Sequence, residues 1–309
     1  MLLTRREFGV TIGAAAAAAA HASASGAGPT AAGFRGQFCF FSKHLPMLAW
    51  GPLAEAVKQV GFDGVDLTVR PGGHVDPVRA REDLPRAIEA IRRHGVEVPM
   101  ITTALVSADD PAARPILETA GRHGVRFFKP GYYNYKLADV RTEVAAVGRA
   151  IAGLAELGQS CGIELGYHNH EGNIGASLWD IAPEIERLPA KWAGFYFDVR
   201  HAVVEGGRIG WKAATRLVAP RLKMIAVKDF FWDKTERGWR VHDCPLGEGM
   251  VDWTWYAKAL AEGGFQGPVS LHLEYDLEAA TADATRARTL DAAARDLQFI
   301  RSRLAQAYT

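Results

Sequence analysis

Short apolar segments alternate strictly with longer amphipathic segments along this 309-residue chain, and this alternation limits the possible folds more than any other feature. The apolar segments, which have the length of buried strands, cover residues 37–41, 64–69, 98–104, 126–129, 163–168, 194–198, 222–228 and 269–274. Helical periodicity follows each of them, at residues 48–60, 81–94, 111–123, 141–159, 181–188, 209–218, 254–262 and 281–305. Strands that alternate with helices run parallel to one another. Eight such units, with no break in composition, predict one α/β domain, a (β/α)8 TIM barrel over residues 36–309.

Polar residues collect where each apolar segment ends, and in a TIM barrel these ends together form the active site. The residues concerned are Ser42, Lys43 and His44; Thr68, Arg70 and His74; Thr102 and Thr103; Lys129, Tyr132 and Tyr133; His168, His170 and Glu171; Asp198, Arg200 and His201; Lys228 and Asp229; and Ser270, His272 and Glu274. Single residues also have structural interpretations, since Lys43 and Arg70 suit solvated positions and Asp198 suits a helix cap. The convergence as a whole predicts a functional site.

The densest of these ends is residues 163–172, where an apolar strand runs into IELGYHNHEG. The period of two in a strand places Gly166, His168 and His170 on one face. Two imidazoles on one face, with Glu171 just beyond, are typical of a divalent-metal site. The alternative is a hydrogen-bonded polar strand end that holds no ligand.

Three segments resemble the xylose isomerase-like TIM-barrel family: YHNHE (167–171), FYFDVRHA (195–202) and VKD (227–229). This family includes sugar isomerases and epimerases, inosose dehydratases and dehydroshikimate dehydratases. Two more segments, DLTVRPGGH (66–74) and PLGEG (245–249), point to an exported branch acting on 3-keto sugars and glycosides. The resemblance implies a barrel that holds Mn²⁺, Mg²⁺, Co²⁺ or Zn²⁺ through a Glu, an Asp, a His and a second Glu at the ends of strands five to eight.

This sequence departs from the family ligand pattern at two of the four positions. The first carboxylate position falls on His168, so that an imidazole replaces a glutamate. Asp198 matches the aspartate and Glu274 matches the final glutamate. The histidine of the seventh strand falls on Ala226, which offers no ligand atom.

We hypothesise that His272 replaces the missing histidine. With a period of two, Ser270, His272 and Glu274 share one face of the eighth strand, and Ala226 leaves room on the neighbouring strand. The expected ligands of a divalent metal, Mn²⁺, Co²⁺, Zn²⁺ or Mg²⁺, are therefore His168, Asp198, His272 and Glu274. His170 and Glu171 are alternative ligands.

The expected chemistry is removal of a proton next to the carbonyl of a keto sugar, which the metal polarises. Candidate bases are His201, His74 and Glu171, while Lys129 and Lys228 stabilise the enolate oxygen or act as desolvated bases. Residues expected to contact the substrate are Lys43, His44, Arg70, Tyr132, His170 and Asp229.

Three functions are consistent with these residues. We favour a lyase or hydratase acting on a keto sugar or 3-keto glycoside, because the isomerases of the family generally keep both glutamates on the metal and this chain has His168. The alternative is a sugar isomerase or epimerase that works through an enediolate. A further alternative is a carbohydrate-binding barrel without catalysis, which the loss of a ligand at Ala226 favours.

The start of the chain predicts export. The pair Arg5-Arg6 precedes an alanine-rich run, Ala14 to Ala20, and the small residues Ala22-Ser23-Ala24 follow. This pattern is typical of a twin-arginine signal peptide over residues 1–24, because the run is far shorter than the ~20 residues that cross a bilayer. Residues 25–35 then form a flexible leader, and we expect a periplasmic or secreted protein that does not stay in the membrane.

Charge and cysteine content exclude other classes. The chain has 36 basic and 35 acidic residues, and residues 1–24 contain Arg5, Arg6 and Glu7, so the remainder has 34 of each. Such a balance argues against a nucleic-acid partner and against the endonuclease branch of this fold. The three cysteines lack a paired motif and are expected to be core or free thiols.

Overall fold

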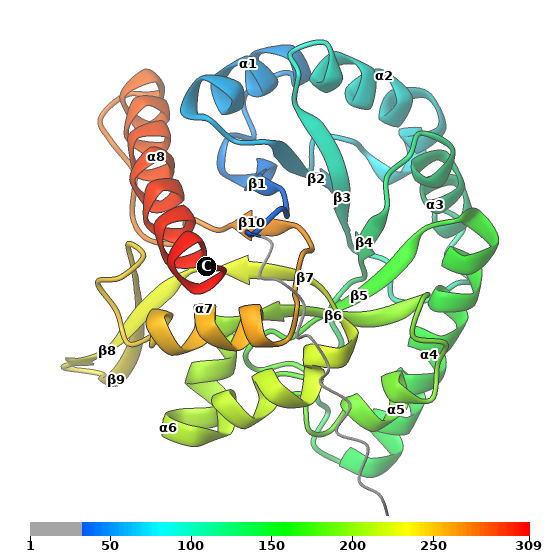
Figure 1. The fold of residues 1–309 in the computed structure, drawn as a ribbon. Helices are drawn as coiled ribbons and strands as arrows, with labels where there is room; N and C mark the ends of the chain where they lie inside the picture. Colours follow the sequence, from blue (N-terminus) through cyan, green and yellow to red (C-terminus); the bar gives the residue numbers. More distant parts are fainter. Residues whose placement is uncertain (1–32) are drawn as a thin grey trace, which may run out of the picture. The chain divides into compact units, whose positions relative to one another are not determined.

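The computed structural model describes residues 33–309. The predicted signal peptide (1–24) and most of the predicted leader (25–35) lie outside the described residues. Eight parallel strands close into a barrel in the order β1-β10-β7-β6-β5-β4-β3-β2, with helices around it (Figure 1). The strands are β1 (Phe38–Phe41), β2 (Gly64–Val69), β3 (Glu97–Thr103), β4 (Phe127–Lys129), β5 (Glu164–His168), β6 (Ala193–Asp198), β7 (Leu222–Val227) and β10 (Val269–Leu271). The predicted (β/α)8 barrel is confirmed.

The helices of the barrel follow its strands, and several of them end close to a glycine. They are α1 (Trp50–Val60), α2 (Ala80–Arg92), α3 (Ala113–Arg122), α4 (Val140–Cys161), α5 (Ala182–Glu186), α6 (Val199–Val218), α7 (Trp253–Glu262) and α8 (Ala282–Ala307), with 3-10 turns η1 (Ser42–His44), η2 (Pro77–Arg79) and η3 (Ala219–Arg221). Gly61 and Gly162 stop α1 and α4 with φ of 105° and 72°, in the left-handed region that glycine adopts without strain.

The core has two layers. Apolar side chains on the outer face of the strands pack against the helices in one large buried cluster. Inside the barrel, a second cluster contains Met100, Phe127, Tyr196, Met224 and Ala226. This inner cluster fills the barrel with side chains, so that polar groups are left for its carboxyl-terminal opening.

Two element boundaries differ from the predicted ones by three residues or more. β10 ends at Leu271 instead of 274, because the amide of Leu273 donates to Nε2 of His44 (3.0 Å) instead of to a neighbouring strand. α6 begins at Val199 instead of 209, and Gly207 interrupts it with non-helical φ and ψ of 53° and −149°, which hides the helical periodicity.

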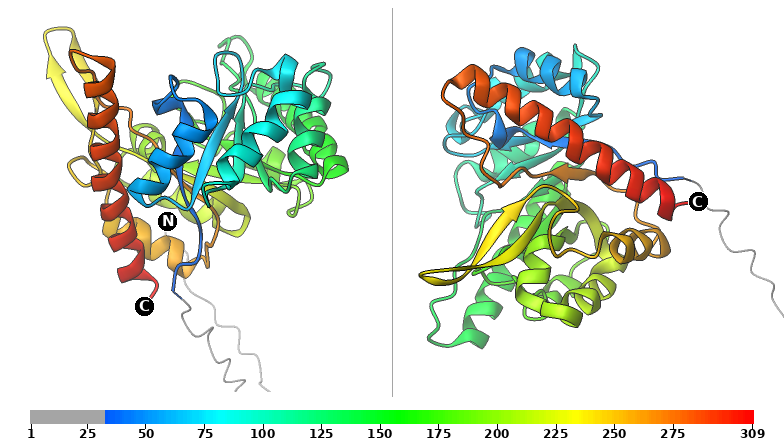
Figure 2. Two further views of the ribbon diagram at one scale, coloured as in Figure 1. Left: turned by 90° about the horizontal axis from the view of Figure 1, so that it is seen from above. Right: turned by 90° about the vertical axis from the view of Figure 1, so that its left-hand side faces the viewer.

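A β-hairpin between β7 and α7 was not predicted. Its strands are β8 (Asp229–Thr235) and β9 (Gly238–Cys244), which pair antiparallel and project from the barrel (Figure 2). Most of its residues are exposed. Exposed charged and aromatic residues show no apolar alternation, so that the strand signal was absent from the sequence.

Within residues 33–309, no helix is both long enough and apolar enough to cross a membrane. Cys39, Cys161 and Cys244 are free thiols, as predicted.

Candidate active site

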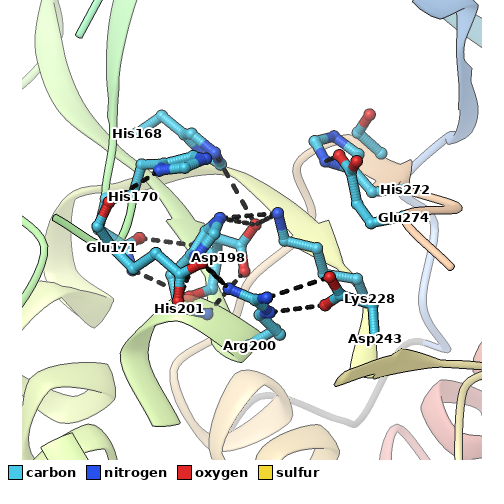
Figure 3. A network of polar contacts seen from close by, with 12 residues as sticks. His168, His170, Glu171, Asp198, Arg200, His201, Lys228, Asp243, His272 and Glu274 are labelled. Carbon is cyan, nitrogen blue, oxygen red and sulfur yellow. Dashed lines mark hydrogen bonds and ion pairs between the residues drawn. The ribbon is translucent and has the colours of Figure 1, made fainter. Parts of the chain in front are cut away.

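Four buried side chains meet at the carboxyl ends of β5, β6 and β7 (Figure 3). His168 ends β5, Asp198 ends β6, His201 lies in the first turn of α6, and Lys228 directly follows β7. The Oδ2 atom of Asp198 is their centre: Nζ of Lys228 lies 3.1 Å from it, and the Nε2 atoms of His201 and His168 lie 3.7 and 3.8 Å from it. One ligand atom each of His168, Asp198 and His201 lies within 4.8 Å of the others. We call these three residues the His–Asp–His group.

The carboxylate of Asp198 is fixed from two sides. Its Oδ1 accepts a hydrogen bond from the amide of His201 (3.1 Å) and so caps α6. Asn169 accepts from the Asp198 amide at 2.7 Å and donates to its carbonyl at 2.9 Å. Oδ2 is buried without a hydrogen bond, since Lys228 lies at ion-pair distance but outside hydrogen-bond geometry. This atom therefore retains the capacity to bind a further partner.

Both imidazoles of the group are neutral. Burial lowers the pKa of His168 well below its usual range, and the charges of Lys129 and Lys228 lower it further. Burial also lowers the pKa of His201, again with help from Lys228. For Asp198, burial raises the pKa and the charge of Lys228 opposes this. A neutral imidazole offers one lone pair, for a metal or for a proton.

Arg200 connects the group to the hairpin. Its guanidinium donates to Oδ1 and Oδ2 of Asp243 at 2.8 and 3.1 Å, and lies 2.6 Å from Oε1 of Glu171 and 2.9 Å from Nδ1 of His201. Glu171, a predicted base, is thus the partner of an arginine. The ring of His170, a predicted substrate contact, lies 4.0 Å from the His201 ring between centroids. The sequence placed Arg200 among the polar strand ends without a role, and it did not predict Asp243, because the hairpin that carries Asp243 was not detected.

The donor chemistry of the His–Asp–His group fits a divalent transition metal. Two imidazoles and a carboxylate are typical ligands for Mn²⁺, Co²⁺ and Zn²⁺. Oδ2 of Asp198 is a buried polar atom without a hydrogen bond, and such an atom gains most from a bound ion. One side chain opposes this fit, because Lys228 Nζ also lies 2.7 Å from Nε2 of His201.

The other two predicted ligands lie apart from this group (Figure 3). Glu274 accepts hydrogen bonds from Nζ of Lys43 at 2.8 and 3.1 Å. His272 lies with Nε2 3.1 Å from the hydroxyl of Tyr196, and its Nδ1 is 3.9 Å from Glu274. Since β10 ends before both residues, they do not have the strand geometry assumed for them. The structure therefore brings His168 and Asp198 together with His201, and pairs Glu274 with a lysine.

A buried carboxylate inside the barrel orients His272. Asp66 accepts hydrogen bonds from Thr102 (2.8 Å), Ser270 (2.8 Å) and Tyr196 (3.1 Å). Burial raises the pKa of Asp66 to about 6, although these hydrogen bonds oppose the shift. Because the Tyr196 hydroxyl donates to Asp66, its oxygen accepts from Nε2–H of His272 and leaves the lone pair on Nδ1. Sequence reasoning missed Asp66, although a charged residue within the apolar segment 64–69 was a signal for it.

Three predicted residues form another wall of the opening. Lys129 is buried, with Nζ 3.4 Å from the centroid of the Tyr132 ring. Burial lowers the pKa of Lys129 well below its usual range, and the charge of Arg70 adds to this. Tyr132 remains 39% exposed, and its ring centroid lies 4.7 Å from that of His170. The guanidinium carbon of Arg70 lies 5.8 Å from the Phe41 ring centroid.

The remaining predicted residues support loops around the opening. His44 accepts a hydrogen bond from the Leu273 amide, and burial lowers its pKa to about 3. Nδ1 of His74 lies 3.2 Å from Oγ1 of Thr68 and ties down the turn after β2. Asp229 is fully buried and accepts hydrogen bonds from backbone amides and an indole N–H of its own chain.

Comparisons with known proteins agree with this architecture. A xylose isomerase-like TIM barrel protein from Mycobacterium smegmatis, solved in complex with magnesium, has a TM-score of 0.66 at 14% identity, over 88% of this chain and 98% of that chain. D-psicose 3-epimerase with D-tagatose, from Clostridium cellulolyticum H10, has a TM-score of 0.65 at 14% identity, over 87% and 99%. D-allulose 3-epimerase from Methylomonas sp., in complex with D-allulose, has a TM-score of 0.64 at 15% identity, over 87% and 98%.

At such identities these structures show a shared fold. No curated protein sequence matches this chain. The family model described as xylose isomerase-like TIM barrel matches residues 54–303, which is most of the sequence. This chain therefore belongs to the xylose isomerase-like TIM-barrel family.

Proposed function

We propose that this protein isomerises or epimerises a keto sugar by moving a proton at the carbon next to the carbonyl. The observation that carries the proposal is a set of buried neutral imidazoles on two sides of one opening, with His168 and His201 on one side and His272 on the other (Figure 3). An epimerase removes a proton from one face of a carbon and returns it to the other face. The structural similarity to D-psicose and D-allulose 3-epimerases supports this reaction class over the lyase that we favoured from the sequence.

His272 is the side chain best placed to take the proton. Its Nδ1 is buried and has no hydrogen-bond partner among residues 33–309. The contact with Tyr196, which itself donates to Asp66, keeps the ring proton on Nε2 and the lone pair on Nδ1. In this scheme Tyr196 and Asp66 are positioning residues.

His168, Asp198 and His201 would hold a divalent metal ion. When bound, Mn²⁺, Co²⁺, Zn²⁺ or Mg²⁺ polarises the carbonyl and lowers the pKa of the adjacent C–H. The aromatic face of Tyr132 suits stacking on a sugar ring, and Lys129 and Arg70 bring N–H donors for its oxygens.

A lyase or hydratase acting on a 3-keto glycoside is the second candidate. His168 stands where the isomerases of the family are expected to have a glutamate, so that one carboxylate is absent from the group. The same proton removal ends in elimination when the substrate carries a leaving group at the β carbon.

Hydrogen exchange distinguishes the two reactions. The protein is incubated with Mn²⁺ in D₂O, with D-fructose, D-allulose and a 3-keto glucoside, and the products are followed by NMR. Deuterium next to the carbonyl together with an epimer or isomer supports our proposal. A 2-hydroxyglucal or a released aglycone supports the lyase.

The role of His272 is tested by His272→Gln, which we expect to slow the exchange by roughly 10²- to 10⁴-fold, the usual contribution of a proton-transfer group. The matched control is His123→Gln, an exposed histidine at the end of α3, which should leave the rate unchanged. Sugar binding in calorimetry without exchange or elimination would contradict catalysis and support a carbohydrate-binding barrel.

A further inference from the structure

Lys228 lies close to two of the three ligand residues of the His–Asp–His group. Its Nζ lies 3.1 Å from Oδ2 of Asp198 and 2.7 Å from Nε2 of His201, and it is buried (Figure 3). The two atoms that it approaches are those through which Asp198 and His201 face one another, 3.7 Å apart. The chain thus places one of its own cations inside a group of metal-ligand type.

A divalent ion and this ammonium exclude one another. An ion bound to carboxylate oxygen and imidazole nitrogen lies about 2.0–2.2 Å from each ligand atom. An ion at that distance from both Asp198 Oδ2 and His201 Nε2 would lie against the Nζ atom of Lys228. Repulsion between two positive charges at such a separation is strong in a buried site.

The backbone brings Lys228 to this position. Ala226, two residues earlier in β7, pairs in register with Asp198 of β6 and is fully buried. Ala226 belongs to the inner cluster of the barrel, and Lys228, which directly follows β7, reaches the Asp198 carboxylate. On the far side of His201, Arg200 lies 2.9 Å from Nδ1, so that cationic side chains face both ring nitrogens.

We propose that the ammonium of Lys228 is the resident cation of the His–Asp–His group and that a divalent ion enters only by displacing it. This inference rests on the proposed metal site. In the metal-free protein Lys228 neutralises the buried Asp198 carboxylate. In the metal-bound protein the lysine is released toward the opening, where Glu274 is the next carboxylate. The divalent ion and the Lys228 ammonium then compete for the Asp198 carboxylate, and the difference between their binding free energies sets the metal affinity.

Metal binding to Lys228→Met tests this competition. Metal-stripped proteins are titrated with Mn²⁺ in a calorimeter without sugar. We expect Lys228→Met to bind Mn²⁺ roughly 5- to 150-fold more tightly than the wild type, which is the usual range of coupling between two sites. The matched control is Lys223→Met, because Lys223 pairs with buried Glu164 at the opposite, amino-terminal end of the barrel. This control should keep the wild-type affinity.

A stability measurement provides an independent readout. Without metal, Lys228→Met leaves Asp198 without its cation, so that we expect a lower melting temperature that Mn²⁺ restores. If Lys228→Met does not fold, Lys228→Gln is used, which keeps a polar side chain of similar length. Unchanged or weaker Mn²⁺ binding by the variant, or no binding at all, would overturn the inference. If Lys228→Met binds Mn²⁺ more tightly but the wild type turns over no sugar, the inference is supported and the proposed function is contradicted.

Discussion

Among single residues, Asp66 combines complete burial with a negative charge. Its pKa rises from 3.8 unfolded to about 6 in the folded protein, mainly through burial. The folded state therefore binds this proton more tightly than the unfolded state. Stability from this group is greatest below pH 3.8 and is lost as the pH rises through about 6. A difference of about 2 pKa units corresponds to about 3 kcal/mol.

We expect the wild type to lose about 3 kcal/mol of unfolding free energy relative to Asp66→Asn between pH 3.5 and pH 7.5. Urea denaturation of both proteins across this range measures the effect. Asparagine changes the hydrogen bonds to Thr102, Ser270 and Tyr196, which shifts the unfolding free energy by the same amount at every pH. Because asparagine does not titrate, it adds no pH dependence of its own. Parallel stability curves for the two proteins would show that Asp66 does not titrate in this range.

At the scale of elements, an ion pair near the base of the hairpin β8–β9 helps to hold the hairpin on the barrel. Asp243 of β9 accepts two hydrogen bonds from Arg200 of α6, a charge-assisted bidentate contact. Loss of such a bond costs roughly 1.5–3 kcal/mol. We therefore expect Asp243→Asn to accelerate amide hydrogen exchange in the hairpin roughly 10- to 100-fold, as measured by mass spectrometry.

Asp233→Asn is the control, because Asp233 lies exposed on β8 of the same hairpin. It should leave the exchange rates unchanged. Equal acceleration in both variants would mean that net charge, and not the contact with Arg200, holds the hairpin.

The elements also show what the sequence could predict. All eight barrel strands were predictable, because each is an apolar run that a helix follows. The hairpin was not, since exposed residues such as Lys234 and Arg240 carry no periodicity. The end of β10 depends on His44, which is more than 200 residues away in the sequence.

The candidate site was predictable as a location and only in part as a geometry. Asp198 and His168 stand at strand ends, which the barrel rule makes convergent. Lys228 reaches Asp198 from the next strand of the barrel, and Glu274 pairs with Lys43 from the opposite end of the chain. Such contacts are decided by the closed barrel and leave no local pattern.

For the whole molecule, a bound metal would stabilise the fold by mass action. A ligand that binds only the folded state at about 100 times its dissociation constant adds about 2.7 kcal/mol. We expect Mn²⁺ to raise the melting temperature of the wild type and not that of Asp198→Asn, which loses a charged ligand. Asp291→Asn, at an exposed position on α8, is the control and should respond like the wild type. An equal response of all three proteins would place the metal elsewhere.

Barrel closure and the proposed export also act on the whole chain. β1 pairs with β10, Phe38 with Val269, so that the barrel cannot close until nearly all residues are available. A twin-arginine signal suits such a chain, because that pathway carries proteins that have already folded. We expect Arg5→Lys with Arg6→Lys to keep the precursor in the cytoplasm, as measured by fractionation and immunoblotting. Arg35→Lys with Arg81→Lys, at exposed positions outside the signal, should leave export unchanged. A chain truncated before β10 should also be retained in the cytoplasm, since its barrel stays open. Normal export of the Arg5→Lys, Arg6→Lys variant or of the truncated chain would contradict export by the twin-arginine pathway.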